Sequence, residues 1–282
     1  MLKLNPHKPF FISPPFGYYF SHPNAYSVLG SYTPLPRPGR FSQIIKTVRP
    51  VEGGWLNKIG LRNPGMKSIK TWQHNQILSF AAITGEEGEW EQIIDHIRSK
   101  IVFIYSPHEP GSTIIEINIS CPNTNHPVPM LPSRYQLSKL LLDYNSRLTT
   151  IFKLQPLLHQ ALDTAQKLAD QGATYLHLSN TLPTPIGGIS GKHLREANLP
   201  IVDRVASEVC TRYPNLELIA GGGIYDISHL KQYLSSGATR FSLATAFVKP
   251  WRGYKIINQY SQERECARIL SEEIGKIEIK HN

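Results

Sequence analysis

Hydrophobic and polar residues alternate along short segments of this chain, and amphipathic segments follow most of the later ones. The alternation predicts eight β-strands, at residues 9–13, 26–33, 77–84, 112–120, 150–155, 174–180, 216–221 and 239–246. The spacing of apolar residues predicts helices at residues 134–148, 159–171, 199–213 and 227–237, with Asp226 as the N-cap of the last. Strand and helix alternating to a count of eight in 282 residues is what a (β/α)8 barrel, or TIM barrel, requires. We therefore expect an α/β fold with a single TIM-barrel domain over residues 1–282.

Residues 34–76 do not fit this alternation. They contain the stretches TPLPRPGR and GGWLNKIGLRNPG, which have no clean periodicity. A long irregular segment in a compact domain is either evidence against the assignment or a functional loop. Because this one follows the second predicted strand, it would emerge on the catalytic face of a barrel.

Polar residues occupy inward positions at the ends of three neighbouring predicted strands. In the fourth strand, isoleucines alternate with Glu116, Asn118 and Ser120, and Cys121 follows; the fifth carries Lys153, and residues 179–181 at the end of the sixth read Ser-Asn-Thr. Alternate side chains of a barrel strand point inward, and an inward polar group is costly unless it is paired or faces a ligand. Taken singly, each has an ordinary explanation as a turn asparagine, a buried cysteine or a lysine with its amine in solvent. Together they favour a polar site at the mouth of the barrel.

The last two predicted strands indicate a phosphate site. The stretch IAGGGI at residues 219–224 places three glycines at the end of the seventh strand, and SLATAF at residues 242–247 ends the eighth with small residues. Loops after these strands commonly bind phosphate in TIM barrels, because glycine lets backbone N–H groups approach the oxygens. The loop PIGGISGKHL at residues 185–194 could supply further amides.

Composition and charge narrow the class of protein. The chain is 40% hydrophobic and 18% charged, which suits a globular protein. Because no apolar run approaches the ~20 residues that cross a bilayer, we expect a soluble protein without membrane contact. The net charge of +9 comes from scattered lysines and arginines, which favours a solvated basic surface over a nucleic-acid partner. Three widely separated cysteines indicate neither a disulfide framework nor a metal site, and a reducing cytoplasm fits best.

The motifs EINISCPN, FKLQP, LSNT, GGISGKHL, LIAGGGI and ATAF, in this order, resemble those of the dihydroorotate dehydrogenases. WLNKIGLRNPG and PRPG match the loop after the second strand of the same family, so the resemblance runs from about Pro9 to Phe247. These proteins are FMN-containing barrels of pyrimidine biosynthesis. The resemblance implies oxidation of dihydroorotate to orotate, in which a base removes a proton from C5 while hydride leaves C6 for flavin N5. It also implies that residues 34–76 cover the substrate.

By this resemblance, Cys121 is the base, and a cysteine at this position is typical of the soluble class 1 enzymes. The membrane-associated class carries an N-terminal helical extension, whereas this chain begins at the first strand. Lys153 matches the lysine that stabilises charge at the N1 and O2 end of the flavin. The residues expected to bind the pyrimidine are Asn57, Lys58, Ile59, Gly60, Leu61, Asn118, Asn123, Asn180 and Thr181. Those expected to bind FMN are Ser13, Ser31, Asn118, Lys153, Ser179, Gly191, Gly222, Gly223, Ala244 and Thr245. We also expect a homodimer.

The sequence departs from the family pattern at three places. Gly30 stands where the family has a lysine that contacts flavin and the substrate carboxylate, Pro14 replaces a glycine, and Ala244 replaces the glycine of the phosphate loop. Two alternatives therefore stay open: an FMN reductase resembling the tRNA dihydrouridine synthases, and a non-catalytic flavin-binding homologue. The sequence leaves the electron acceptor open, and because the cysteines lack iron–sulfur spacing, an NAD-linked enzyme would need a partner subunit.

Overall fold

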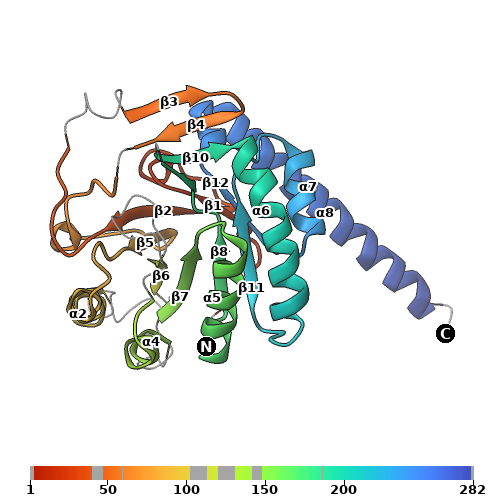
Figure 1. The fold of residues 1–282 in the computed structure, drawn as a ribbon. Coiled ribbons are helices and arrows are strands. Elements are labelled where there is room, and N and C mark those ends of the chain that lie inside the picture. Colours follow the sequence, from red (N-terminus) through yellow and green to blue (C-terminus); the bar gives the residue numbers. More distant parts are fainter. Residues whose placement is uncertain are drawn as a thin grey trace.

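The computed structural model describes residues 3–39, 47–58, 60–101, 113–119, 131–141, 148–185 and 187–280. Eight strands from these residues form a closed barrel in which every neighbouring pair is parallel (Figure 1). In order around the barrel they are β1 (Phe10–Ile12), β2 (Ala25–Tyr32), β5 (Gln76–Phe80), β6 (Thr113–Asn118), β7 (Leu148–Leu154), β8 (Tyr175–Leu178), β11 (Glu217–Gly221) and β12 (Arg240–Leu243). Each lies within or beside a predicted strand, so the TIM barrel is confirmed.

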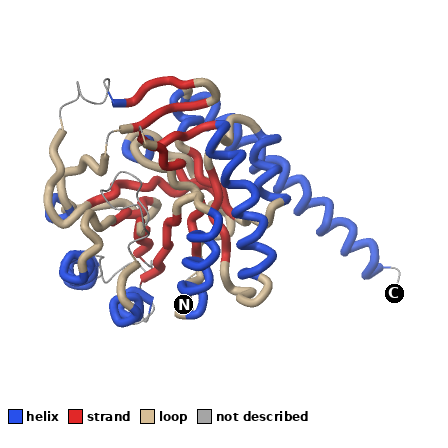
Figure 2. The backbone as a smooth tube through the Cα atoms, viewed as in Figure 1, coloured by secondary structure: helices blue, strands red, loops and turns tan. Residues whose placement is uncertain are grey.

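Helices cover the outside of the barrel (Figure 2). They are α2 (Glu87–His96), α4 (Arg134–Leu141), α5 (Leu158–Asp170), α6 (Lys192–Val205), α7 (Ile227–Ser235) and α8 (Pro250–Lys280). In α5, the buried residues Ala161, Ala165, Leu168 and Ala169 recur at helical spacing and form the face that packs on the barrel. The far end of α8 extends away from the barrel toward the C-terminus (Figure 1).

Two of the four predicted helices agree closely with the structure, and two differ. Helices α5 and α7 begin within one residue of their predicted starts, and the Asp226 carboxylate accepts the backbone N–H of His229 as the predicted N-cap. The predicted helix 199–213 in fact begins at Lys192 and passes through Pro200. Proline is common in the first turn of a helix, whereas Pro200 lies inside this one. The predicted helix 134–148 overlaps β7, which already includes Leu148.

A small antiparallel sheet lies at the end of the barrel toward which β7 and β8 point (Figure 1). Its strands, in order, are β3 (Val48–Val51), β4 (Gly54–Asn57), β10 (Gly187–Gly191) and β9 (Leu182–Thr184). The pairing of β4 with β10 joins two segments that the sequence showed as separate loops. A Cβ atom added to Gly54 would lie 1.8 Å from the Ser190 carbonyl oxygen, so this close pairing requires glycine.

The inside of the barrel is layered. Phe11, Val28, Ile77, Ile151 and Tyr175 belong to a buried apolar cluster that is separate from the core between strands and helices. Two residues further along, where the side chain again points inward, three of these strands carry Ser79, Lys153 and His177. The interior therefore changes from apolar to polar toward the carboxyl ends of the strands.

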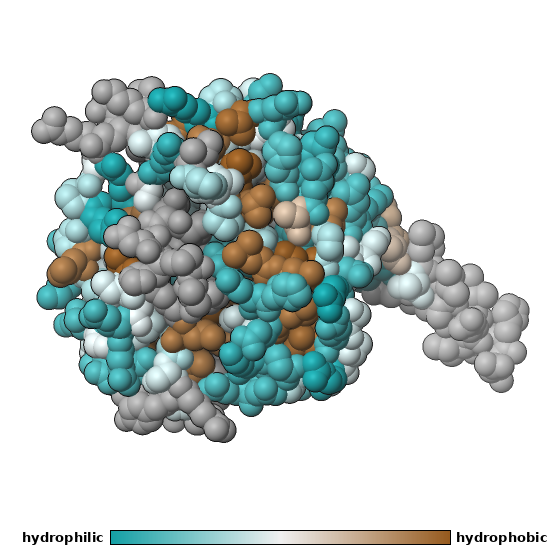
Figure 3. Space-filling model, viewed as in Figure 1, coloured by the Kyte–Doolittle hydropathy of each residue, from teal (hydrophilic) through white to brown (hydrophobic). Residues whose placement is uncertain are grey.

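The surface is mainly hydrophilic on the face shown in Figure 3, where hydrophobic residues form several separate patches. Within the part of the chain that the structure describes, no helix combines the length and apolar character that a membrane span needs.

Candidate functional site

A cavity opens at the carboxyl ends of the barrel strands, beneath the sheet that contains β4 and β10. Residues from six barrel strands and the loops that follow them line it, together with residues of that sheet. They are Ser13, Pro14, Asn57, Gly60, Leu61, Asn118, Lys153, Ser179, Asn180, Thr181, Ser190, Leu194, Gly222, Gly223, Ile224, Ser242, Leu243, Ala244 and Thr245. This is the end of the barrel where TIM-barrel enzymes bind their substrates.

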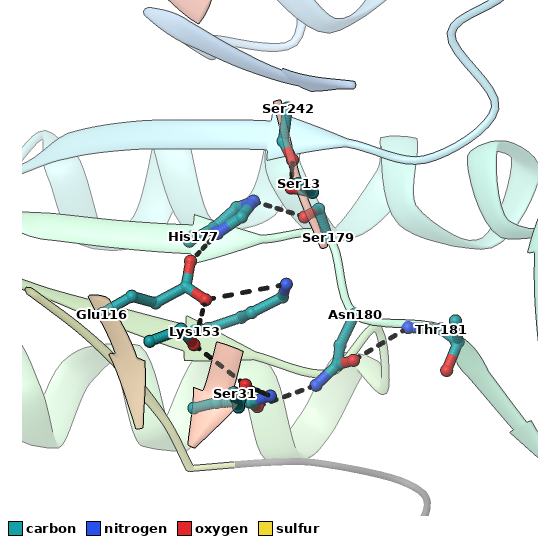
Figure 4. Close-up of polar contacts among 11 residues, drawn as sticks. Ser13, Ser31, Glu116, Lys153, His177, Ser179, Asn180, Thr181 and Ser242 are labelled. Atoms are coloured by element: carbon teal, nitrogen blue, oxygen red, sulfur yellow. Dashed lines mark hydrogen bonds and ion pairs between the residues drawn. The ribbon is translucent and has the colours of Figure 1, made fainter. Parts of the chain in front are cut away.

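Two asparagines on one wall of the cavity form a directed pair. Asn180 Nδ2 donates to Asn118 Oδ1 at 3.0 Å, and Asn118 Nδ2 donates to Ser31 Oγ at 3.2 Å. The backbone N–H of Thr181 donates to Asn180 Oδ1 at 3.1 Å (Figure 4). These bonds orient both amides, and an amide side chain can both donate to and accept from a ligand.

A buried carboxylate organises the polar layer below this pair. Glu116 is 1% exposed and accepts a hydrogen bond from Ser79 Oγ at 2.8 Å. Its other oxygen lies 2.5 Å from His177 Nδ1, and Lys153 Nζ lies 3.8 Å from Oε1 (Figure 4). Lys153 thus has the anionic partner that an inward lysine needs, and the pair is nearly neutral overall.

The charges of this cluster follow from its contacts. Burial by itself would raise the pKa of Glu116, but the charges of Lys153 and His177 and the hydrogen bonds from His177 and Ser79 lower it to about 2. Burial lowers the pKa of His177; the Glu116 charge opposes this shift, and the Lys153 charge adds to it. At neutral pH the cluster therefore holds an anionic Glu116 beside a neutral imidazole.

The opposite wall is built from glycines in conformations that other residues rarely adopt. Gly191, Gly222 and Gly223 have φ angles of 99°, 103° and 67°. A Cβ atom added to Gly223 would lie 2.3 Å from the Gly191 carbonyl oxygen, so the two loops touch through their backbones. Behind them, the buried Asn198 side chain donates to the carbonyls of Leu178 and Gly221 and joins the ends of β8 and β11. Such a cradle of bare backbone suits an anionic phosphate group.

The hydroxyl of Thr181 has no hydrogen-bond partner among the residues that the structure describes. Thr181 Oγ1 is buried, although Thr181 lines the cavity. A buried hydroxyl usually has a partner, so a polar ligand group at this wall would complete its bonding. The glycine cradle and this hydroxyl together fit a ligand that carries a phosphate and a polar ring.

The comparisons with known proteins agree with this geometry. A family model described as dihydroorotate dehydrogenase matches residues 19–265. The chain belongs to the dihydroorotate dehydrogenase family. Among curated relatives, the Cutibacterium acnes protein named dihydroorotate dehydrogenase B (NAD(+)), catalytic subunit, is 30% identical over 91% of this chain and 88% of the relative. A protein of the same name from Citrifermentans bemidjiense is 30% identical over 83% of this chain and 81% of the relative.

A solved structure shares the fold of this family member. The crystal structure of DHODH from Eimeria tenella in complex with ferulenol superposes with a TM-score of 0.63. It covers 89% of this chain and 79% of that chain at 15% identity. At 15% identity, this similarity shows only that the two proteins share the barrel fold.

Most of the predicted site residues lie together at the cavity. Those that line it directly are Asn57, Gly60, Leu61, Asn118, Asn180, Thr181, Ser13, Lys153, Ser179, Gly222, Gly223, Ala244 and Thr245. Ser31 contacts it through Asn118, and Gly191 contacts it through Gly223. Lys58 is exposed. Ile59, Cys121 and Asn123 lie outside the described residues, so their predicted roles stay predictions.

The sequence interpretation overlooked His177 and gave Glu116 no role in the site. The signal was available, because His177 lies midway between Tyr175 and Ser179 in an alternating strand and must share their inward face. A histidine on an otherwise apolar strand is easily taken for a packing residue. Its hydrogen-bond partner Glu116 comes from β6, 61 positions away, and no local pattern reveals that contact.

The backbone at Gly30 leaves no room for a side chain. Gly30 has a φ of 116°, and a Cβ atom there would lie 2.4 Å from the Ser79 carbonyl oxygen. A lysine at this position would therefore distort the contact between β2 and β5.

Proposed function

We propose that this protein oxidises dihydroorotate to orotate and that FMN is its cofactor. The observation that carries the proposal is the position of the paired amides of Asn118 and Asn180 beside Lys153, at the catalytic end of a barrel of this family. Neutral amides suit a pyrimidine ring, whose edge alternates N–H and C=O groups, because each amide can donate and accept.

The cofactor residues fall into two groups. The backbones of Gly222, Gly223, Ala244 and Thr245, with Gly191 behind them, would hold the phosphate. Ser13, Ser31, Asn118, Lys153 and Ser179 would hold the ring. When bound, FMN supplies the hydride acceptor. Lys153, a cation on the cavity wall, would balance the negative charge that the site gains on reduction.

The substrate residues orient the ring and remove its proton. Asn57, Asn118, Asn180 and Thr181 would hold the pyrimidine, together with the backbone of residues 58–61. Cys121, by family resemblance, would take the proton from C5. Its thiol must spend time as thiolate, so either its pKa lies below ~8.5 or the rate rises with pH.

The electron acceptor is proposed from the relatives. Their names designate NAD(+)-dependent catalytic subunits, and we extend this assignment to the present chain. Because the cysteines of the sequence lack iron–sulfur spacing, electrons would leave the flavin through a partner subunit. The homodimer stays a prediction.

The first test concerns the cofactor and the reaction. Protein expressed with ample riboflavin is expected to be yellow, with one FMN per chain, and anaerobic dihydroorotate is expected to bleach the flavin absorbance. A colourless protein without affinity for added FMN would contradict the proposal. A flavin that binds but is not reduced by dihydroorotate would favour the RNA-reductase or non-catalytic alternatives.

The second test concerns the binding partner of the substrate carboxylate. Gly30 stands where the family pattern has the lysine that contacts this carboxylate. A cation nevertheless approaches the loop that lines the cavity, because Arg37 Nη2 lies 4.0 Å from the place that a Cβ atom on Gly60 would occupy. We expect Arg37→Ala to weaken orotate binding by about ten- to a hundredfold, since a charge-assisted hydrogen bond contributes ~1.5 to 3 kcal/mol. Titration of the FMN-loaded protein with orotate measures this.

A matched control is Arg204→Ala, an exposed arginine of α6 paired with Glu208. This control should bind orotate as the unmodified protein does. Arg37→Ala should leave FMN affinity unchanged, because Arg37 is not among the residues proposed to hold the cofactor. Unchanged orotate affinity in Arg37→Ala would exclude Arg37 as the carboxylate partner.

A further inference from the structure

His177 lies at the centre of a hydrogen-bonded chain that ends at the cavity. Its Nδ1 contacts Glu116, and its Nε2 contacts the hydroxyl of Ser179. His177 is fully buried, whereas Ser179 lines the cavity. The chain therefore connects a buried carboxylate to a ligand-facing hydroxyl through a single imidazole.

The direction of each hydrogen bond follows from Glu116. An ionised carboxylate can only accept, so the proton of the neutral imidazole lies on Nδ1. The Nε2 atom is then an acceptor, and the Ser179 hydroxyl must donate to it. Because a hydroxyl has one hydrogen, Ser179 can present only lone pairs to the cavity.

The same carboxylate directs the other side of the cavity. Ser79 donates to Glu116 and so accepts from Ser31, which lies 2.9 Å away. Ser31 in turn accepts from the amide of Asn118. Glu116 thus orients hydrogen bonds on both sides of the barrel interior.

We propose that His177 is a positioning residue that, held by Glu116, keeps the Ser179 hydroxyl an acceptor toward the cavity, where it selects the ring N–H of bound flavin. Oxidised flavin has one ring N–H, at N3, flanked by two carbonyls. If a flavin carbonyl oxygen faced Ser179, its lone pairs would meet those of the hydroxyl and repel them. The arrangement therefore favours the orientation of the ring that places N3–H at Ser179. The inference rests on the proposed FMN cofactor.

The same connectivity occurs in serine hydrolases, where histidine takes the proton of a nucleophilic serine. That chemistry requires an imidazolium ion. Here it would form in a fully buried site with the Lys153 ammonium on the same carboxylate, and both burial and Lys153 lower the pKa of His177. The histidine is therefore a poor base, and Ser179 is an acceptor rather than a nucleophile.

Binding of FMN and N3-methyl-FMN to the apoprotein tests the selection. N3-methylation is expected to weaken binding about tenfold more in the unmodified protein than in Ser179→Ala. This tenfold difference corresponds to one neutral hydrogen bond. Ser190→Ala is the matched control, because Ser190 also lines the cavity but donates to the Trp55 carbonyl. This control should keep the full effect of methylation. An equal effect of methylation in the unmodified protein and Ser179→Ala would overturn the proposal.

A second measurement does not need flavin. In ¹⁵N-histidine NMR spectra of the apoprotein at pH 7, His177 is expected as the neutral tautomer with its proton on Nδ1. Its Nε2 signal is identified by its shift in Ser179→Ala. An imidazolium ion, a proton on Nε2, or labelling of Ser179 by a fluorophosphonate would overturn the proposal. If the protein binds no flavin, the proposed cofactor is wrong and so is the selection of its N–H, while these spectra still decide the tautomer.

Discussion

Replacing Cys121 with alanine is expected to slow flavin reduction by dihydroorotate by a factor of 10² to 10⁴, the usual contribution of a positioned base. FMN content, folding and orotate binding should be retained, because the thiol is proposed to take a proton and not to hold either ligand. Stopped-flow reduction at saturating dihydroorotate and matched flavin content measures the effect.

Two further variants separate catalysis from packing. Cys121→Ser should retain part of the activity with a pH profile displaced upward, because a hydroxyl is harder to deprotonate than a thiol. Cys210→Ala is a control at the half-buried Cys210 of the π-helix η4 (Ala206–Cys210), where burial raises the pKa of the thiol to about 11. It should reduce flavin at the original rate. Equal reduction rates in Cys121→Ala and the unmodified protein would exclude Cys121 as the base.

Replacing Glu116 with glutamine is expected to lower the free energy of unfolding at pH 7 by about 3 to 5 kcal/mol. The substitution removes the anionic partner of a buried ion pair, so the Lys153 ammonium loses the negative charge beside it. Urea denaturation measures the loss. The exposed ion pair of Arg204 and Glu208 offers the control, since Glu208→Gln should cost less than about 1 kcal/mol.

The same variant should change the dependence of stability on pH. The pKa of Glu116 is about 2 in the folded protein and ordinarily 4.5, so the folded state binds this proton less readily than the unfolded chain. Its contribution is therefore fully present above pH 4.5 and is lost as the pH falls toward 2. The difference in unfolding free energy between the two proteins should shrink across this range. A difference that stays constant from pH 7 to pH 3 would contradict the assigned ion pair.

The polar end of the barrel could be predicted because its signals are local. In β6, a strict alternation of isoleucine with Glu116 and Asn118 assigns the two faces without knowledge of any other strand. In β7, Lys153 stands between two hydrophobic residues for the same reason. The consecutive glycines Gly222 and Gly223 indicate backbone conformations that other residues rarely adopt.

Contacts between distant segments could not be predicted in this way. Strands β4 and β10 pair across more than 130 residues, and their glycine-rich sequences lack the alternation that marks a strand. Helix α6 begins at Lys192, before the predicted start at residue 199, and it contacts β10 and β11, which the local apolar spacing does not reveal.

The sequence alone predicted the barrel, its polar mouth, the glycine loop and the family resemblance. These predictions were possible because alternation and motif order are properties of residues that are close together in the chain. Only the tertiary structure decided which of the inward polar groups meet. Glu116, Lys153 and His177 come from three consecutive barrel strands, and the pairing of β6 with β7 and of β7 with β8 brings them together in the buried interior. Their charges and hydrogen-bond directions depend on that proximity and burial, which no single segment of the chain contains.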